Sequence, residues 1–376
     1  MMNEAVKVLS LVSYKFLPPD MGGQKGIAFF NRYLAKLVNL ICVTVEENTG
    51  HSENYLVKSI ISNSKLRYVN LFYFFTIRKI IKDEKITHLI IEHPYYGWLG
   101  ILLKWSCNIK LIVHSHNIES LRFKSMGKWW WGILWNYEKY THLQAHHNFF
   151  IHADDRMYAI ENFKLNPGKC TVVTYGFEHA AIPSAEEKKA ARQTICDIYK
   201  VPPNGKILLF NGTLGYKPNL NAVDIILNEI NPLLLAAEGF TYRIIICGNK
   251  LPVAYNGLTN YKDKHIIYAG FVDDINLFFK GADIFINPVM DGGGIKTKLV
   301  EALGYNCSVI STKSGAIGIP SEVAGNKMKI IEDNNWQHFA ESIINLQTDV
   351  DTATTFFEHF YWGNIAGKAA GILNNI

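Results

Sequence analysis

The sequence lacks several features that would each point to a particular class of protein. No window approaches about 18 uninterrupted apolar residues, and the most apolar stretch, 69–81, is broken by Asn70, Arg78 and Lys79, so no membrane-spanning helix is expected. The six cysteines include no C-x-x-C pair, which disfavours a disulfide framework or a zinc site and indicates a reducing compartment. The formal net charge is only +5, which suits anionic small molecules or a membrane surface better than dedicated nucleic-acid binding.

Two nucleotide-binding signatures are also missing. The glycines do not match the spacing G-x-x-x-x-G-K-[ST], and no G-x-G-x-x-G with an acidic residue at the usual distance follows the first expected strand. Kinase-like and dehydrogenase activities are therefore disfavoured. Residues 1–19 carry neither the long apolar region nor the cleavage site of a secretory signal, so we expect a buried strand there.

What the chain does contain is a repeated alternation of short apolar runs and helix-length segments, within 376 residues that are 48% hydrophobic. The runs are 6–12, 41–45, 88–91, 110–113, 148–151 and 171–174, and then 207–210, 243–247, 266–269, 284–286, 308–311 and 328–331. This pattern predicts an α/β fold with two doubly wound, Rossmann-like domains. We expect an N-terminal domain over 1–182, a C-terminal domain over 183–355, and a tail, 356–376, that packs back on the first domain.

The most informative stretch is a glycine turn between an apolar run and a helix, at 284–304. Glycines allow a ligand to approach the backbone closely, and the start of a helix offers unpaired N–H groups. Lys296 and Lys298 fall in the first helical turn, where a positive charge becomes favourable if an anion is bound. Glu301 lies three residues after Lys298, so a phosphate and a sugar could be held on one helix face.

Residues 292–312, which begin G-G-G-I-K-T-K-L-V-E-A-L-G, resemble the donor-binding segment of glycosyltransferase family 4 (group 1), of the bacterial cell-surface polysaccharide type. Shorter segments resemble the same family in the right order along the chain: 18–23, 114–120, 210–219, 246–248 and 268–272. The resemblance implies the GT-B fold, in which two Rossmann-like domains face each other across a cleft. It also implies a retaining transfer by a front-face mechanism, with a nucleotide diphosphate sugar as co-substrate and no cofactor or metal.

The resemblance also assigns roles to particular residues. It places His116, Lys298 and Glu301 in catalysis. Donor binding is assigned to the glycine loops and the strand ends: Gly22, Gly23, Gly212, Thr213, Lys217, Gly248, Phe271, Val272, Asp291, Gly292, Gly293, Gly294 and Ile295. Acceptor or membrane contact is assigned to Asn117, Glu119, Arg122, Lys128, Trp129 and Trp130.

Two positions depart from the family pattern. Many members carry two glutamates with seven residues between them, and counting back from Glu301 places Gly293 at the first. Either Asp291 or the backbone amides of 292–295 could take over that role. Many members also have an arginine where this chain has Thr213, so phosphate binding is expected to depend more on Lys298 and Lys217.

The segment 122–137 combines basic residues with four tryptophans. Tryptophan favours membrane interfaces and lysine favours anionic headgroups, so the segment is either a membrane-docking or acceptor-lipid surface, or a part of the core. His142 and His146 have the spacing of a helical metal pair but no convincing third ligand, and the D-x-D at 349–351 follows a helical pattern, which indicates a solvated turn.

The resulting hypothesis is a cytoplasmic glycosyltransferase, peripheral on the inner face of the membrane, that moves a hexose from a UDP- or GDP-sugar to a lipid-linked or polysaccharide acceptor. Two alternatives remain open. One is a nucleotide-sugar epimerase of the same fold, and the other is a non-catalytic, nucleotide-binding partner. Nucleic acid is not an expected partner.

Overall fold

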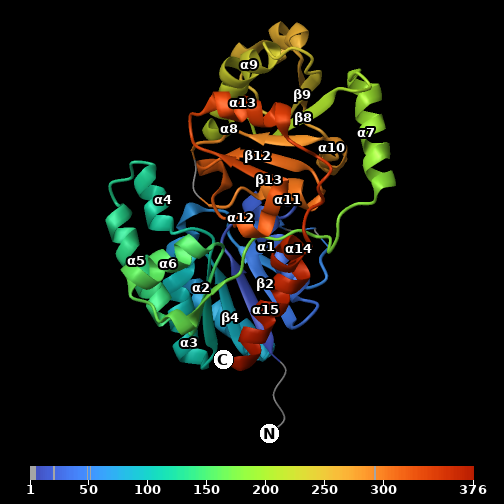
Figure 1. The fold of residues 1–376 in the computed structure, drawn as a ribbon. Helices are drawn as coiled ribbons and strands as arrows, with labels where there is room; N and C mark the ends of the chain where they lie inside the picture. Colours follow the sequence, from blue (N-terminus) through green and yellow to red (C-terminus); the bar gives the residue numbers. More distant parts are fainter. Residues whose placement is uncertain (1–5, 20–21, 49, 51, 292–293) are drawn as a thin grey trace. The chain divides into compact units, whose positions relative to one another are not determined.

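The computed structural model describes the chain except residues 1–5, 20–21, 49, 51 and 292–293 (Figure 1). It divides into two compact units, with residues 1–178 and 360–376 in unit 1 and residues 179–359 in unit 2. These divisions lie four residues from the boundaries expected at 182 and 356.

Unit 1 is built on one parallel sheet. Its strands are β1 (Lys7–Val12), β2 (Asn39–Val45), β3 (Leu56–Ile61), β4 (His88–Glu92), β5 (Lys110–Ser115), β6 (His147–Phe150) and β7 (Cys170–Val172), in the order β3-β2-β1-β4-β5-β6-β7. Its helices are α1 (Gly22–Leu34), α2 (Phe72–Asp83), α3 (Gly97–Cys107), α4 (Glu119–Ser125), α5 (Trp131–Gln144), α6 (Ala153–Phe163) and α15 (Trp362–Asn375). Leu89, Ile90 and Ile91 are consecutive in β4 and all fully buried, so both faces of the sheet are covered.

Unit 2 has the same kind of architecture. Its strands are β8 (Lys206–Asn211), β9 (Tyr242–Cys247), β10 (Ile266–Gly270), β11 (Ile284–Asn287), β12 (Ser308–Thr312) and β13 (Met328–Ile331), all parallel and in the order β10-β9-β8-β11-β12-β13. Its helices are α7 (Ala185–Tyr199), α8 (Lys217–Ile225), α9 (Asn231–Leu235), α10 (Ile275–Gly281), α11 (Thr297–Gly304), α12 (Ser321–Ala324), α13 (Trp336–Asn345) and α14 (Thr354–Phe360), the last of which reaches the boundary with unit 1. The prediction of two doubly wound, Rossmann-like domains is therefore confirmed.

A local sequence signal accounts for where helix α7 begins. At the start of α7, Ser184 Oγ accepts from the Glu187 backbone N–H at 3.1 Å and the Glu187 carboxylate accepts from the Ser184 N–H at 2.8 Å. The apolar C-terminal helix α15 packs against α1 in unit 1.

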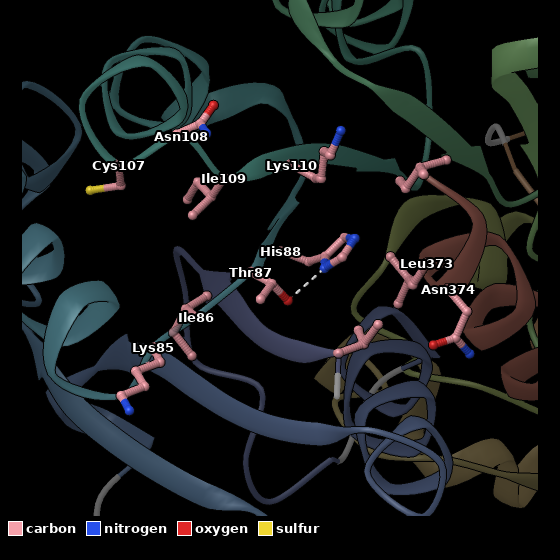
Figure 2. Close-up of a pocket in the computed structure, with 12 residues that line it drawn as sticks. Lys85, Ile86, Thr87, His88, Cys107, Asn108, Ile109, Lys110, Leu373 and Asn374 are labelled. Carbon is pink, nitrogen blue, oxygen red and sulfur yellow. Dashed lines mark hydrogen bonds between the residues drawn. The ribbon is translucent and has the colours of Figure 1, made fainter. Parts of the chain in front are cut away.

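A pocket of about 530 Å³ opens at the amino ends of the unit 1 strands (Figure 2). It lies next to the first residues of β4 and β5, where Thr87 Oγ1 is 2.8 Å from His88 Nδ1 and Lys110 borders the opening. Ligands of open α/β sheets bind outside the carboxyl ends of the strands. This pocket is therefore at the opposite end of unit 1 from the expected site.

Candidate functional site

Lys298 lies in the first turn of α11, at the carboxyl ends of the unit 2 strands. Its Nζ donates to the Asn211 backbone oxygen at 3.3 Å and to Asn219 Oδ1 at 3.2 Å, and it lies 4.4 Å from the centre of the Phe210 ring. None of these three contacts supplies a negative charge. Burial, and then the nearby charge of Lys296, lower the pKa of Lys298 to about 7. A bound phosphate would stabilise the charged ammonium there.

Two glycines allow the ends of β8 and β9 to approach each other closely. A Cβ atom on Gly248 would lie only 1.9 Å from the Gly212 backbone oxygen, and one on Gly212 would lie 2.6 Å from Asn219 Nδ2. Gly212 N donates to the Cys247 backbone oxygen at 3.1 Å. A Cβ atom at Gly248 would overlap backbone, and one at Gly212 would overlap the Asn219 side chain, so the two glycines leave room for Asn219 to lie beside Lys298 at these strand ends.

The loops after β11 and β12 are braced together by buried polar side chains. Asn287 Nδ2 donates to Ser311 Oγ at 2.9 Å and to the Gly315 backbone oxygen at 3.2 Å. Thr312 Oγ1 donates to the Val289 backbone oxygen at 2.5 Å. Because Val289 lies two residues before Asp291, this brace holds the start of the glycine turn.

The glycine turn itself is described in part. Gly294 has a φ of 74°, a conformation that favours glycine, and its backbone oxygen accepts from Lys296 Nζ at 3.2 Å. Burial lowers the pKa of Lys296 to about 8. Asp291 is exposed and accepts from Asn221 Nδ2 at 3.1 Å. The predicted residues Gly292 and Gly293 lie outside the described residues.

The other predicted donor residues of unit 2 lie after its strands or in the helices that follow. Phe271 is 71% exposed immediately after β10, where a flat aromatic ring is available for stacking. Thr213, Val272, Ile295 and Glu301 are half-buried, and Lys217 is exposed as the first residue of α8. The set therefore collects along the carboxyl edge of the sheet, where Lys298 and Glu301 are half-buried and Asp291 and Lys217 are exposed.

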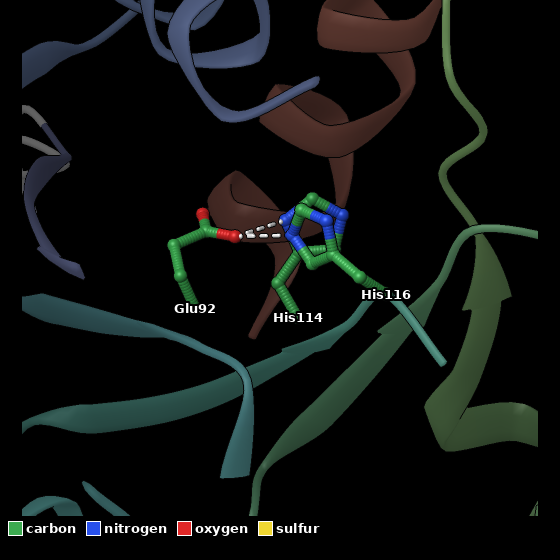
Figure 3. A group of neighbouring side chains, drawn as sticks. All are labelled: Glu92, His114 and His116. Carbon is green, nitrogen blue, oxygen red and sulfur yellow. Dashed lines mark hydrogen bonds and ion pairs between the residues drawn. The ribbon is translucent and has the colours of Figure 1, made fainter. Parts of the chain in front are cut away.

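In unit 1, His116 is part of a buried group with Glu92 and His114 (Figure 3). Glu92 Oε2 accepts from His116 Nε2 at 2.7 Å and lies 2.9 Å from His114 Nδ1. Burial lowers the pKa of His116 to about 4, whereas the two histidines depress the pKa of Glu92 well below its usual value despite its burial. Glu92 therefore holds the proton of His116 on Nε2 and leaves Nδ1 as the acceptor.

These three side chains are also of types that bind divalent metals. Their ligand atoms all lie within 4.8 Å of one another, and no other group of three such residues comes together among the described residues. The sequence suggested no metal ligands here. Glu92 Oε2 hydrogen-bonds His116 Nε2, whereas its 2.9 Å contact with His114 Nδ1 lacks hydrogen-bond geometry. Both ring nitrogens of His114 and Glu92 Oε1 are buried without a hydrogen-bond partner in the described part of the chain.

Glu119 is the centre of a second buried group at the same edge. Its carboxylate accepts from Tyr95 Oη at 2.6 Å, from Arg122 Nη1 at 2.9 Å and from His93 Nδ1 at 3.1 Å. The His93 ring stacks on His116 with centroids 4.4 Å apart, which links the two groups. Glu119 is fully buried, so it reaches other molecules only through its neighbours.

The backbone at His93 is unusual. Its φ of 66° and ψ of 158° lie in a region that is almost restricted to glycine. Tyr14 Oη lies 3.0 Å from His93 Nε2, so the ring is held on both nitrogens. Asn117 Nδ2 also approaches Glu119 Oε1, at 3.4 Å. Strain of this kind is maintained where a side chain must be kept at a site.

The tryptophan segment divides between surface and interior. Trp129 is 84% exposed and Lys128 is exposed beside it, whereas Trp130 is half-buried and packs against Phe123, with the two rings tilted and their centroids 4.6 Å apart. Trp135 is half-buried against the core of unit 1, and its Nε1 donates to the Tyr158 hydroxyl at 3.0 Å. The segment therefore contains one tryptophan that is exposed to solvent and others that pack against neighbouring side chains.

The remaining sequence signals have simple structural explanations. Gly22 and Gly23 are the first two residues of α1. His142 Nδ1 lies 2.8 Å from Asn148 Oδ1, and His146 Nδ1 accepts from the Leu111 N–H at 3.0 Å, so neither histidine is arranged as a metal ligand. Asp349 and Asp351 are exposed and outside any helix or strand, as predicted for a turn.

Sequence reasoning missed several residues that the structure brings to the site. In unit 1 these are Tyr14, Glu92, His93, Tyr95 and His114, and in unit 2 they are Asn211, Asn219 and Asn287. Glu92 and Asn287 each end a strand directly after the apolar runs 88–91 and 284–286, so a search of the residue that follows every apolar run would have found them.

Family models match both units of the chain. The model for Glycosyltransferase Family 4 matches residues 22–180, and the model for Glycosyl transferases group 1 matches residues 205–349. The chain belongs to the group 1, family 4 glycosyltransferases. A curated relative of this glycosyltransferase, described as an uncharacterized 44.6 kDa protein in the cps region of Klebsiella pneumoniae, is 29% identical over 153 residues. The match covers 38% of this chain and 37% of that protein.

Solved glycosyltransferase structures share the whole fold. A glycosyltransferase from Rickettsia africae has a TM-score of 0.71 at 19% identity, covering 99% of this chain and 98% of that one. HepE from Anabaena, in complex with UDP, has a TM-score of 0.71 at 12% identity, covering 99% and 100%. WaaG, involved in lipopolysaccharide biosynthesis, has a TM-score of 0.66 at 13% identity, covering 98% and 99%. The GT-B fold is therefore confirmed. Among the described residues of this glycosyltransferase, no helix has the length and apolar character needed to cross a membrane.

Proposed function

We propose that this glycosyltransferase moves a hexose from a nucleotide diphosphate sugar to a lipid-linked or polysaccharide acceptor in cell-surface glycan synthesis. The observation that carries the proposal is the position of Lys298, half-buried at the start of α11 with neutral contacts to Asn211 and Asn219. A diphosphate supplies the negative charge that these contacts do not provide. HepE has been crystallised with UDP-glucose, and WaaG is involved in lipopolysaccharide biosynthesis, which supports this substrate class.

We assign the donor to unit 2 and the acceptor side to unit 1. In unit 2, Lys298 and the amides at the start of α11 stabilise the charge that develops on the departing diphosphate, and Phe271 is available to stack on the base. Glu301, one helical turn after Lys298, accepts hydrogen bonds from sugar hydroxyls. Asp291 and Lys217 lie on the exposed side of the same edge.

In unit 1, His116 contacts the transferred sugar or the acceptor. Since Glu92 holds the proton on Nε2, the other ring nitrogen, Nδ1, accepts a hydrogen bond from a hydroxyl group. The transfer retains the anomeric configuration, and the leaving phosphate takes the proton of the incoming hydroxyl. This mechanism requires neither a nucleophilic side chain nor a metal.

We place the protein on the cytoplasmic face of an anionic membrane. Unit 1 contains 22 Lys and Arg against 14 Asp and Glu, a formal net charge of +8, whereas unit 2 contains 16 against 19, a net charge of −3. Trp129 and Lys128 are exposed between α4 and α5. A basic surface with an exposed tryptophan suits anionic headgroups, where a lipid-linked acceptor would be found.

The experiment that tests the function is product analysis after incubation with UDP- and GDP-hexoses, with and without membranes, in the presence of EDTA. Transfer of the hexose to a membrane lipid or glycan supports the proposal. Conversion of the donor to its epimer without an acceptor would identify an epimerase instead. The glycine at position 293, where many relatives have a glutamate, favours a non-catalytic partner as the second candidate, which would bind nucleotide and form no product.

A further inference from the structure

The buried group of Glu92, His114 and His116 contains polar atoms that the proposed transfer does not use. Glu92 Oε1, His114 Nδ1 and His114 Nε2 have no hydrogen-bond partner among the residues that the structure describes. Glu92 and His114 are each only 1% exposed, so solvent does not reach these atoms. Because nearly all buried polar groups in native proteins are satisfied, three such atoms in one group indicate that something binds there.

The register of the sheet brings the three side chains together. Glu92, the last residue of β4, pairs with His114 in β5. His116 follows two residues after His114, and the two imidazole rings have centroids 4.6 Å apart. Figure 3 shows Glu92 Oε2 directed at both rings. A carboxylate and two imidazoles therefore converge at the carboxyl ends of two adjacent strands.

Two imidazoles and one carboxylate form a ligand set typical of divalent transition metals, with Zn²⁺ as the most familiar example. Glu92 Oε2 lies 2.7 Å from His116 Nε2 and 2.9 Å from His114 Nδ1. A tetrahedral Zn²⁺ with bonds of about 2.0–2.1 Å places its ligand atoms about 3.4 Å apart. Shifts of less than about 1 Å in these side chains would therefore admit the ion.

The charge of Glu92 also favours a cation. In the described part of the chain its carboxylate forms ion pairs with the imidazoles of His114 and His116 and with no lysine or arginine. Arg122 pairs instead with Glu119. A buried carboxylate is costly without a positive charge beside it, and a divalent ion would supply that charge.

Aromatic packing holds the imidazoles in place. The His114 ring lies between Phe30 and Phe149, with centroid distances of 4.8 Å and 6.1 Å. His93 stacks on His116 at 4.4 Å, and both ring nitrogens of His93 are already engaged, so His93 is not a fourth ligand. Three protein ligands leave one position of a tetrahedral ion open to water or to a hydroxyl group.

We propose that Glu92, His114 and His116 bind one divalent transition-metal ion, of the Zn²⁺ class, in unit 1. The ion is not part of donor binding, which we assign to unit 2. Its effect on transfer rests on the proposed function, because a metal at His116 Nε2 replaces the proton there and leaves the proton of the neutral ring on Nδ1. Nδ1 then donates a hydrogen bond where it otherwise accepts one.

The site is tested by metal binding, without any activity. The full-length protein is prepared without a polyhistidine tag, freed of metal with a chelator, and titrated with Zn²⁺ against a chromophoric chelator and with Co²⁺ by visible absorption. The variants are Glu92→Gln and His114→Gln, which each remove one ligand. The matched control is His88→Gln, which replaces a buried histidine at the opposite end of β4.

We expect one Zn²⁺ per chain in the unmodified protein and in the control. Both variants should lose about 100-fold or more in Zn²⁺ affinity, since even changes outside the ligand set cost about 10–100-fold. Co²⁺ should give the strong visible absorption of a four-coordinate ion, and Mg²⁺ should not compete. UDP affinity, measured by calorimetry, should be equal in all four proteins, so a failure at the donor site is distinguished from a failure of this proposal.

X-ray absorption spectroscopy of the unmodified protein with one equivalent of Zn²⁺ gives a test that does not depend on the folding of a variant. Two imidazoles, oxygen and no sulfur around the ion would support the proposal. A cysteine ligand would place the ion elsewhere and overturn it. So would the absence of bound Zn²⁺, or an equal affinity in Glu92→Gln and the control, since the three side chains would then form a hydrogen-bonded group only.

Discussion

Lys298 places a positive charge among neutral partners, so its removal should matter most for ligands that carry phosphate. We expect Lys298→Ala to weaken UDP binding by about 1.5–3 kcal/mol, the range for a hydrogen bond to a charged group. Uridine binding should change far less, because the nucleoside lacks the diphosphate. Calorimetric titration with both ligands measures the difference.

The control for this substitution is Lys329→Ala, which removes an exposed lysine from β13 in the same unit. It should leave both affinities unchanged. Equal losses for UDP and uridine in Lys298→Ala would contradict a role in phosphate binding and would indicate a general disturbance of unit 2.

The lowered pKa of Lys298 predicts that diphosphate binding depends on pH. In the free protein the pKa is about 7, and a bound diphosphate raises it because the phosphate stabilises the ammonium. Below pH 7 the charge is already present. Above pH 7 binding must take up a proton, so UDP affinity should fall by up to about tenfold per pH unit until the pKa of the complex is reached. Titrations at pH 8 in buffers of different ionisation enthalpy should show proton uptake, which Lys298→Ala should reduce.

At the same scale, the sequence indicated the members of the candidate site that stand in recognisable motifs, but not the partners that other strands bring beside them. Lys298 and His116 stand next to recognisable motifs. Glu92 and His93 come from a different strand, and their relation to His116 depends on β4 and β5 lying side by side, which no local pattern encodes. The backbone conformation of His93 is likewise a property of the folded unit.

At the level of elements, Glu138 connects α5 to the start of α4. Its fully buried carboxylate accepts from the Glu119 N–H at 2.9 Å, from the Ser120 N–H at 3.0 Å and from Ser120 Oγ at 2.6 Å. Burial raises the pKa of Glu138 to about 7. The carboxylate thus serves as the N-terminal cap of the helix that carries Glu119 and Arg122.

We expect Glu138→Ala to destabilise the protein by about 2–4 kcal/mol, because it leaves buried donors at the start of α4 without an acceptor. Glu138→Gln should cost less, since its amide oxygen still accepts. Urea denaturation followed by circular dichroism measures both, with Glu161→Ala on the exposed side of α6 as the control. A loss in Glu138→Ala no greater than in the control would show that α4 does not depend on this cap.

The close approach of the ends of β8 and β9 gives a second prediction at this scale, which concerns stability and UDP binding. A Cβ atom at Gly248 would lie 1.9 Å from the Gly212 oxygen, so Gly248→Ala must push the two strand ends apart. We expect a loss of about 2 kcal/mol or more in stability, together with weaker UDP binding, because Asn219 and Lys298 sit directly on these ends. Gly371→Ala in α15, where a Cβ atom meets nothing within 4 Å, should be neutral or stabilising. If Gly248→Ala bound UDP with unchanged affinity, the ends of β8 and β9 would not contribute to the donor site.

The pattern of apolar residues along the sequence predicted most of the strands. Every apolar run predicted as a strand coincides with one of the observed strands. Strand β3 was missed, because it is an edge strand whose sequence, Leu56–Ile61, is mostly half-buried or exposed and includes a lysine and a serine. A strand with one solvated edge has no need for a continuous apolar run, and its pairing with β2 is visible only in the sheet.

For the whole molecule, the alternation of apolar runs and helix-length segments predicted the two-domain fold. The difference in net charge between the two units could be calculated only once the structure had assigned the residues to each unit. The C-terminal helix belongs with the basic unit 1, and Lys296 and Lys298, which we propose bind the diphosphate, belong with unit 2, whose net charge is −3. Attraction of the diphosphate therefore depends on the local charge of Lys296 and Lys298 and not on the field of unit 2 as a whole.

The central claim is that unit 2 binds a nucleoside diphosphate through lysines and backbone amides without a metal. The most direct measurement is a calorimetric titration of the full-length protein with UDP, GDP, ADP and CMP, each in the presence and absence of EDTA. We predict selective binding of one nucleoside diphosphate that EDTA does not weaken, together with a rise in unfolding temperature, since a ligand at about 100 times its Kd stabilises the native state by about 2.7 kcal/mol. Binding that disappears in EDTA, or no binding of any of the four nucleotides, would contradict this account.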